Sequence, residues 1–281
     1  MLSKSPKLTP ARIKAFQSQI CAFYRHSGRH NLPWRKTKNP YKILISEVML
    51  QQTQVARVLR KYPEFLEAFS TIETLANAPL SEVLRVWQGM GYNRRARYLR
   101  DTAQKIVVDF KGRIPKTEEE LCALPGVGYY TANAILTFAH DESRVFIETN
   151  IRRVFIHHFF GNKRVATGKI SDEEIKLLVE QTLDHENPCE WYYALMDYGT
   201  HLPRVIRKNP NTQSKHYVSQ STFKGSFREL RGKIIRILSE EPKTLIAVKR
   251  EINNNSRTKE ALDALIKDML ITYEKRKYKL A

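Results

Sequence analysis

The stretch LPGVGYYTANAIL (124–136) is the part of the sequence that decides the fold. Its turn contains Pro125, Gly126, Val127 and Gly128 and lies between two segments with helical spacing of apolar residues. So short a turn needs glycine, because a positive φ angle costs little only without a Cβ. The glycines also let backbone N–H groups approach a ligand, and the following helix N-terminus favours an anion there. The stretch therefore predicts a helical hairpin that binds phosphates without reading sequence, with an ordinary interhelical turn as the alternative.

The rest of the chain predicts a mainly helical protein, because apolar residues recur at three- and four-residue spacing. The segments with this spacing are 13–24, 41–59, 80–87, 95–110, 117–124, 130–139, 151–160, 170–183 and 188–199. Residues that favour helix starts precede several of them, notably Asn39-Pro40, Thr117 and Ser171. Strand-like alternation is scarce before residue 268, so we expect an all-α fold.

The C-terminal part differs in composition from the rest. The polar stretch 203–225 contains two prolines and several serines, which predicts a linker. Three short helical segments follow it, and the ending LITYEKRKYKLA (270–281) predicts a β-hairpin that turns at Lys275-Arg276. Three small helices and a hairpin are typical of a winged helix, so we expect 226–281 to form a basic winged-helix-like domain. A basic helical cap without groove contacts is the alternative.

The charge of the chain points to a polyanionic partner. The 281 residues carry 48 Lys and Arg against 29 Asp and Glu, a net charge of +19, which favours nucleic acid or an anionic membrane surface. Residues 204–281 hold 19 basic and 8 acidic side chains, and therefore a net +11. No apolar run approaches the roughly 18 to 20 residues that span a bilayer, and the first residues have no signal-peptide pattern. We expect a cytoplasmic protein without a membrane partner, associated with the nucleoid if the host is prokaryotic.

Two carboxylates are candidates for chemistry. Glu47 lies inside an apolar helical segment, and Glu148 follows the apolar run 145–147 directly before another helix. Taken singly, each is more typical of a structural role, Glu148 as a helix cap. Together they form the pair that hydrolysis of a glycosidic bond requires: one acid protonates the leaving group and the other carboxylate stabilises the cationic sugar or positions water.

At this point the sequence resembles the helix-hairpin-helix (HhH-GPD) base-excision DNA glycosylases, and within them the MutY-type adenine DNA glycosylases. The resemblance covers residues 32 to 199. It rests on four blocks: LPWR (32–35), NPYKILISEVMLQQTQV (39–55), LANAPLSEVLRVWQGMGYNRRAR (75–97) and LPGVGYYTANAIL (124–136).

The resemblance implies roles for the catalytic residues. Glu47 matches the general acid that protonates the flipped-out adenine, and Asn150 matches the asparagine that supports the catalytic carboxylate. Tyr130 stands where bifunctional relatives carry a Schiff-base lysine, which implies a monofunctional enzyme without a lyase step.

The resemblance also implies residues that contact DNA. Gln51 and Gln52 match the segment that enters the duplex, and Tyr92 matches a wedge beside the opposite strand. Trp34 and Arg35 match residues of the base pocket.

Two further sets of candidate residues follow from the sequence itself. The aromatic residues of 191–193 are mostly core, with Tyr193 near the pocket. Phosphate contacts are expected from Arg94, Arg95, Arg97 and Arg100, with a solvated basic face as the alternative.

Three features depart from the family pattern. The family aspartate is replaced by Glu148, and the longer side chain weakens the adenine assignment. The four-cysteine iron–sulfur loop is absent, because Cys21, Cys122 and Cys189 are far apart, so no iron–sulfur cluster and no metal site is expected. A monovalent cation at the hairpin stays possible, as in relatives. The usual C-terminal domain that reads 8-oxoguanine is replaced by a much shorter segment.

The resulting hypothesis is a monomeric, monofunctional DNA glycosylase acting on double-stranded DNA with a mismatched or damaged base. It excises adenine opposite guanine or 8-oxoguanine. The alternatives are a thymine or uracil mismatch glycosylase, a lyase-active enzyme and a non-catalytic DNA-binding protein. The implied glycosylase domain covers 1–202, with a six-helix barrel over about 31–136 and a second lobe of 1–30 and 137–202; the active cleft is expected between the lobes.

Overall fold

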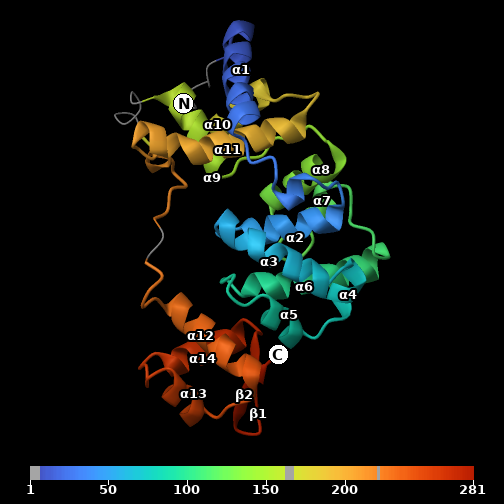
Figure 1. Cartoon of the computed structure of the whole chain (residues 1–281), viewed down its shortest axis with the longest axis vertical. Coiled ribbons are helices and arrows are strands. Elements are labelled where there is room, and N and C mark those ends of the chain that lie inside the picture. Colours follow the sequence, from blue (N-terminus) through green and yellow to red (C-terminus); the bar gives the residue numbers. More distant parts are fainter. Residues whose placement is uncertain (1–6, 162–167, 220–221) are drawn as a thin grey trace. The chain divides into compact units, whose positions relative to one another are not determined.

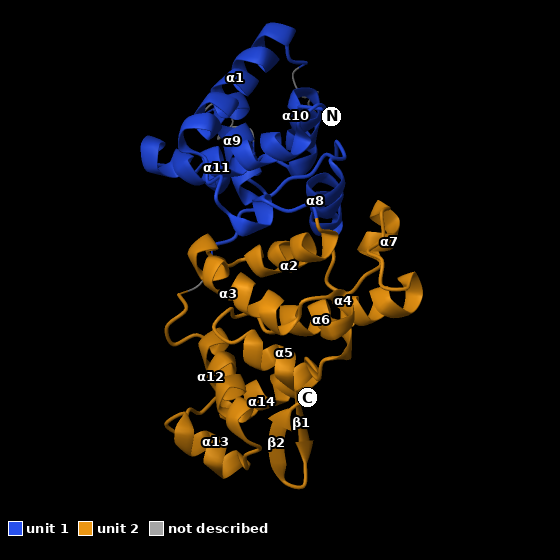
Figure 2. Cartoon of the chain, turned by 45° about the vertical axis from the view of Figure 1, so that its right-hand side comes forward, with its two compact units in different colours: residues 1–38, 128–219 blue, residues 39–127, 220–281 orange. Residues whose placement is uncertain are grey.

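The structure is a computed structural model that describes residues 7–161, 168–219 and 222–281. It is mainly helical, as the apolar spacing predicts (Figure 1). The chain divides into two compact units (Figure 2): unit 1 contains residues 1–38 and 128–219, and unit 2 contains 39–127 and 220–281. Within the described residues, no helix has both the length and the apolar character needed to cross a membrane.

The first part of unit 2 is a helical bundle around α6. Its elements are α2 (Pro40–Leu50), α3 (Val55–Ala68), α4 (Ile72–Asn77), α5 (Leu80–Val86), α6 (Arg94–Phe110) and α7 (Glu118–Cys122). Helix α6 packs against α2, α4 and α5. The helix start predicted at Asn39-Pro40 is confirmed, since the Asn39 side chain accepts hydrogen bonds from the N–H groups of Tyr41 and Lys42.

The helix predicted over 41–59 is wrong as one element, because the chain breaks after α2 and restarts at α3. Gln52 adopts a left-handed φ of 53° in this break, which a continuing helix does not allow. Apolar spacing runs through the break because both helices bury side chains in the same core. Helix α4 was missed, since six residues make too short a periodic pattern.

The second part of unit 2 is the C-terminal module (222–281). Its elements are α12 (Phe227–Glu240), α13 (Leu245–Glu251), α14 (Thr258–Lys267), β1 (Ile271–Glu274) and β2 (Lys277–Leu280). The two strands pair antiparallel, with Glu274 opposite Lys277, which confirms the predicted hairpin and its turn at Lys275-Arg276. Three helices and a terminal hairpin are therefore present, as the sequence indicates.

The C-terminal module packs against the bundle of unit 2 through specific polar contacts. Helix α12 contacts α5. Near that contact Gln88 Nε2 donates to Ser239 Oγ at 2.6 Å and Arg85 Nε donates to the Ser239 carbonyl at 3.0 Å. Arg97 Nη1 donates to the carbonyl of Asp268 at 2.6 Å. The module is thus part of a compact unit and differs from the separately folded domain that a linker over 203–225 suggests.

Unit 1 is built around the long helix α11. Its elements are α1 (Pro10–Ser27), a 3-10 turn η1 (Pro33–Arg35), α8 (Tyr129–His140), α9 (Thr149–Phe155), a π-helical turn η2 (Ile156–Phe160), α10 (Asp172–Thr182), α11 (Pro188–Ile206) and a 3-10 turn η3 (Pro210–Gln213). Helix α11 packs against α1, α8 and α9. The predicted start at Ser171 is confirmed as a reciprocal cap with Glu174.

The boundaries of the units and of α11 differ from the expected lobes and linker in two places. Helix α8 belongs to unit 1, although the barrel was expected to extend to residue 136. Helix α11 continues to Ile206, past the expected linker start at 203, and Asn211 is buried. Proline and serine content therefore overestimated the linker, because Pro203 is accommodated inside the helix.

Candidate active site and DNA-binding surface

Glu47 lies in unit 2, on the buried face of α2. It is only 5% exposed, and its neighbours Ile43, Leu44 and Val48 are buried as well. The predicted position of Glu47 inside an apolar helix is therefore confirmed. Its place on a helix of mostly apolar residues keeps this carboxyl group away from bulk water.

Arg95 fixes the chain that follows Glu47. It is 8% exposed, and its guanidinium donates to the carbonyls of Val48, Met49 and Gln51 at 2.9, 3.0 and 2.5 Å. It also donates to the carbonyls of Met90 and Gly91 and to Thr53 Oγ1, at 3.0–3.2 Å. These bonds satisfy the carbonyls at the end of α2, which have no partner within the helix.

The expected phosphate contact of Arg95 is therefore corrected, because its side chain is buried among protein acceptors. Arg97 is also corrected: it holds the Asp268 carbonyl at 2.6 Å and its side chain is only 15% exposed. Arg94 is exposed, as a phosphate contact requires, although it lies near Asp268 Oδ1 at 3.6 Å. Arg100 is half-buried. The available signal was helical spacing, because Arg95 shares a face of α6 with the buried Leu99 and Ile106.

Two of the residues expected to enter DNA have a left-handed backbone. Gln52 has φ 53° and Tyr92 has φ 47°. This conformation costs roughly 1–2 kcal/mol for a residue with a Cβ, and such strain gathers at functional sites. Arg95 bridges the two loops that carry Gln52 and Tyr92, so its hydrogen bonds hold both of them in shape.

Glu148 lies in unit 1 and caps α9. Its Oε1 accepts hydrogen bonds from the N–H groups of Asn150 at 2.7 Å and Ile151 at 2.9 Å, and Oε2 accepts from Asn150 Nδ2 at 3.2 Å. The cap alternative is thus confirmed as a structural fact. It also fixes the orientation of the carboxyl group, which a stabilising carboxylate needs.

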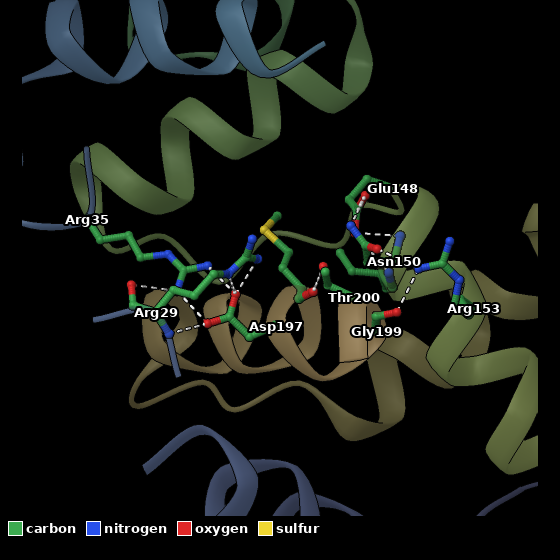
Figure 3. A network of polar contacts seen from close by, with 10 residues as sticks. Arg29, Arg35, Glu148, Asn150, Arg153, Asp197, Gly199 and Thr200 are labelled. Carbon is green, nitrogen blue, oxygen red and sulfur yellow. Dashed lines mark hydrogen bonds and ion pairs between the residues drawn. The ribbon is translucent and has the colours of Figure 1, made fainter. Parts of the chain in front are cut away.

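The side chains around Glu148 form a supporting network (Figure 3). Arg153 Nη1 donates to Asn150 Oδ1 at 2.7 Å and to the Gly199 carbonyl at 2.6 Å. A Cβ at Gly199 would lie 2.4 Å from the Asn150 carbonyl oxygen, so only glycine allows α11 to approach α9 this closely. Asn150 therefore supports Glu148, while Arg153 and Gly199 support Asn150.

The surroundings shift the acidity of Glu148. Burial raises the pKa of Glu148, and the N–H groups of Asn150 and Ile151 and the charge of Arg153 offset this only in part, so its pKa stays above the usual range. Burial disfavours the anion, whereas hydrogen bonds to the carboxylate favour it. Glu148 is thus protonated more readily than an exposed glutamate.

A second polar cluster on α11 involves residues expected in the base pocket. Asp197 pairs with Arg35 Nη1 and Nη2 at 2.8 Å, and with Arg29 Nε at 2.7 Å and Arg29 Nη2 at 2.5 Å (Figure 3). The guanidinium of Arg35 lies 4.5 Å from the centre of the Tyr193 ring, while Trp34 is buried. Arg35 and Tyr193 are therefore brought together.

Asp197 was missed by the sequence reasoning. An acid within the apolar run of α11 (188–206) was the available signal, since a buried carboxylate needs a cationic partner. Burial by itself raises the pKa of Asp197, but the hydrogen bonds and charges of Arg35 and Arg29 outweigh burial and hold the pKa below its usual range. Asp197 is therefore an anion that orders both arginines.

Tyr130 lies in the first turn of α8, in unit 1. It is half-buried, and its ring packs edge to face on Phe146, with the ring centres 5.6 Å apart. Phe146 is two residues before Glu148 in the chain. The predicted position at a helix start is confirmed.

The hairpin has the backbone that its glycines predict. Gly126 has φ 74°, and a Cβ there would lie 2.8 Å from Cβ of Tyr98. The carbonyl of Pro125 accepts a hydrogen bond from Thr102 at 2.6 Å, and Val127 is buried. Gly128 is the N-cap of α8 and supplies no side-chain cap, so the first N–H groups of α8 have no side-chain acceptor from their cap residue.

Metal ligands do not gather in the part of the chain that the structure describes. Among residues 7–161, 168–219 and 222–281, no group of three or more His, Cys, Asp or Glu side chains is arranged to hold a metal ion. Cys21, Cys122 and Cys189 are free thiols.

Similar proteins share this fold. The solved structure of a thermostable thymine-DNA glycosylase matches with a TM-score of 0.61 and 27% identity, over 72% of this chain and 92% of that one. A trapped endonuclease III–DNA intermediate matches with a TM-score of 0.57 over 69% of this chain and 88% of that one; at 21% identity it shows the fold alone.

Proteins with similar sequences identify the family more specifically than the solved structures do. The adenine DNA glycosylase of Buchnera aphidicola (Baizongia pistaciae) is 37% identical over 69% of this chain and 54% of that protein. This chain thus spans about half the length of such Buchnera relatives. The adenine DNA glycosylase of Mycobacterium tuberculosis is 30% identical over 91% of this chain and 90% of that protein. The model of the "HhH-GPD superfamily base excision DNA repair protein" family matches residues 45–181. The chain therefore belongs to the HhH-GPD superfamily of base excision DNA repair proteins, among the adenine DNA glycosylases.

Proposed function

We propose that this protein is a monofunctional DNA glycosylase that excises adenine mispaired with guanine or 8-oxoguanine. The observation that carries the proposal is the similarity to a named adenine DNA glycosylase along about nine-tenths of both chains. The buried Glu47 and the oriented Glu148 supply the two carboxyl groups that the reaction needs.

Glu47 serves as the general acid. It transfers a proton to a ring nitrogen of the adenine that has been turned out of the duplex, and the base then leaves with the electron pair of the N-glycosidic bond. The low exposure of Glu47 keeps bulk water away from the proton that it transfers.

Glu148 stabilises the sugar that remains. Loss of the base leaves an oxocarbenium-like cation, and the negative charge of Glu148 lowers its energy. Water then adds to C1′ of the sugar and gives up a proton to the carboxylate of Glu47, which restores the acid. The products are free adenine and an abasic site. Glu47 must be protonated and Glu148 ionised for this step. Burial opposes the ionised form of Glu148, and the N–H groups of Asn150 and Ile151 and the charge of Arg153 favour it.

The identity of residue 130 as tyrosine favours an enzyme that hydrolyses the glycosidic bond and leaves the DNA strand uncut. A lyase step needs an amine that attacks the sugar carbon and forms a Schiff base. The phenol of Tyr130 cannot form that bond. We therefore expect the abasic site to stay intact until alkali is added, and borohydride to trap no covalent protein–DNA adduct.

The test is a panel of duplexes with A·G, A·8-oxoguanine, A·C, T·G and U·G pairs, each incubated with the protein and then treated with alkali. We expect cleavage at adenine opposite guanine or 8-oxoguanine. The Glu47→Gln variant should bind the same duplexes and release no base, whereas the control Glu67→Gln, at an exposed position of α3, should excise normally. Full excision by Glu47→Gln would refute the mechanism.

Thymine or uracil excision is the second candidate, and one observation favours it. The thymine-DNA glycosylase structure matches over 92% of its own length. Alkali-sensitive breaks at T·G or U·G pairs, with A·G and A·8-oxoguanine intact, would establish this alternative. Tight binding with no break in any duplex would instead indicate a non-catalytic DNA-binding protein.

A further inference from the structure

The C-terminal module contributes side chains to the surface that carries Gln51, Gln52 and Tyr92. A cavity of about 440 Å³ in unit 2 is lined by these three residues and by Arg228 and Arg231 of α12. A larger cavity beside it, of about 710 Å³, has α12 along one side and residues 88–93 along the other. Residues more than 130 positions apart in the sequence thus form one surface.

The contact between Arg228 and Tyr92 is direct. The guanidinium of Arg228 donates a hydrogen bond to the Tyr92 hydroxyl and lies 5.4 Å from the centre of its ring. The guanidinium of Arg95 lies 5.5 Å from the same ring. Tyr92, with its left-handed backbone, is therefore held by one arginine of α6 and one of the C-terminal module.

The charge of this surface suits a phosphodiester strand. Four of the residues lining the smaller cavity are arginines and none is acidic. Arg95 is buried among carbonyls, so Arg94, Arg228 and Arg231 are the three that can face a strand. The Asp268 carboxylate pairs with Arg231 and lies 3.6 Å from Nε of Arg94, so it orients two of these arginines. In the larger cavity Glu229 pairs with Lys233 at 2.9 Å, which leaves Arg57, Arg228 and Arg236 in excess there.

On the basis of the proposed function, we propose that α12 completes the binding site for the intact DNA strand, the one opposite the excised base. Arg228 and Arg231 bind phosphates of that strand, and Arg228 also positions Tyr92 next to it. The short C-terminal module thereby acts as a strand clamp. Arginine suits this task because its planar fork of donors matches phosphate oxygens.

The test compares Arg228→Met with Arg250→Met, a control that removes the same charge from an exposed position of α13 in the same module. Binding to A·G duplex is measured by fluorescence anisotropy across a salt series, and hydroxyl-radical footprinting is read on each strand. We expect Arg228→Met to weaken binding about tenfold and to reduce the salt slope by about one, as loss of one phosphate contact does. Protection should be lost on the intact strand near the mismatch and retained on the target strand.

Two measurements separate this effect from damage to the fold. Arg228→Lys keeps the charge and should restore most of the affinity, and the melting curve of each variant reports its folding. Equal affinity and equal footprints for Arg228→Met and Arg250→Met overturn the clamp. Equal loss of protection on both strands also overturns it.

Binding and footprinting do not depend on excision. A wild-type protein that protects both strands and releases no base therefore refutes the proposed activity and leaves the clamp standing. Normal excision with a normal footprint of Arg228→Met refutes the clamp alone. A wild-type protein that binds no duplex refutes both.

Discussion

Replacement of Arg95 by methionine should loosen the part of unit 2 that carries the DNA-insertion residues. The substitution keeps an apolar side chain of similar length and removes the guanidinium. Six acceptors then lose their bond from Arg95, five of them backbone carbonyls at the end of α2 and in the loops around Gln52 and Gly91. The carbonyls of Gly91 and Gln51 keep a second bond, from Trp87 Nε1 and Thr53 Oγ1.

The expected loss of unfolding free energy follows from the burial of those acceptors. Three of the carbonyls, of Val48, Met49 and Met90, receive their bonds from Arg95 in buried surroundings. A buried acceptor without a donor costs about 1–3 kcal/mol. A gain opposes this loss: burial lowers the pKa of Arg95 to about 10, which shows that the buried charge is itself unfavourable. We therefore expect a net loss of about 3 kcal/mol, which is roughly 1 kcal/mol for each of the three buried carbonyls and lies at the lower end of that range.

Urea unfolding gives the free energy, and hydrogen exchange locates it. Amides of residues 50–54 and 88–92 should exchange much faster in Arg95→Met, while those of α11 in unit 1 stay protected. Arg94→Met is the matched control, because it removes the neighbouring exposed arginine and should cost less than about 0.5 kcal/mol. Arg95→Lys should lie between the two, since an ammonium has three donors.

The reasoning fails if Arg95→Met loses less than about 1 kcal/mol of unfolding free energy, the cost of removing one exposed ion pair. It also fails if the two loops exchange no faster than in Arg94→Met. Either result would mean that water replaces the guanidinium without cost.

Four further predictions concern unit 1 and the C-terminal β-hairpin. Asp197→Asn leaves Arg35 buried without its counter-charge and should lower the free energy of unfolding in urea by about 3–5 kcal/mol. Because the native pKa of Asp197 is low, its contribution to stability is complete above about pH 4 and is lost as pH falls further. The free energies of unfolding of wild type and variant should therefore converge in acid. Gly199→Ala should lower stability by about 1–3 kcal/mol through the clash of α11 with α9, and unchanged melting would contradict the close approach. Arg276→Gly should raise the stability of the C-terminal module by about 1 kcal/mol, seen as a higher melting temperature, since Arg276 has φ 62° in the hairpin turn. The single-turnover excision rate should fall as pH is lowered through the raised pKa of Glu148. A rate that stays level down through the range where an exposed glutamate titrates would count against an ionised Glu148.

Much of the fold was predictable because local chemistry determines it. Apolar spacing identified most helices, and the caps at Asn39 and Ser171 placed their starts. The PGVG turn predicted the positive φ of Gly126, and the C-terminal residues predicted a hairpin with its turn at Lys275-Arg276. These features depend on neighbours in the chain, so a single sequence contains the information.

The roles of individual charged residues were less predictable. Arg94, Arg95 and Arg97 are neighbours in the sequence, yet one is exposed, one is buried among carbonyls and one binds the C-terminal module. Arg95 stands at helical spacing from Leu99, Thr102 and Ile106, which are all buried, so the spacing could have placed it on the inner face of α6. The carbonyls of α2 that it binds are more than 40 residues away in the chain and could not be predicted. Asp197 was overlooked for a related reason, because its two arginine partners lie more than 160 residues away in the chain.

The helical class, the PGVG helical hairpin, the family resemblance and the two candidate carboxylates could all be inferred from the sequence alone. Each depends on residues that are close together in the chain or on blocks that match the family. The folded structure was needed to show that Gly199 of α11 packs on Asn150, that Arg95 binds the carbonyls at the end of α2, and that α12 brings Arg228 to Tyr92. These contacts join segments that are far apart in the chain. Their energy comes from burial and hydrogen bonds that exist only after the chain has folded.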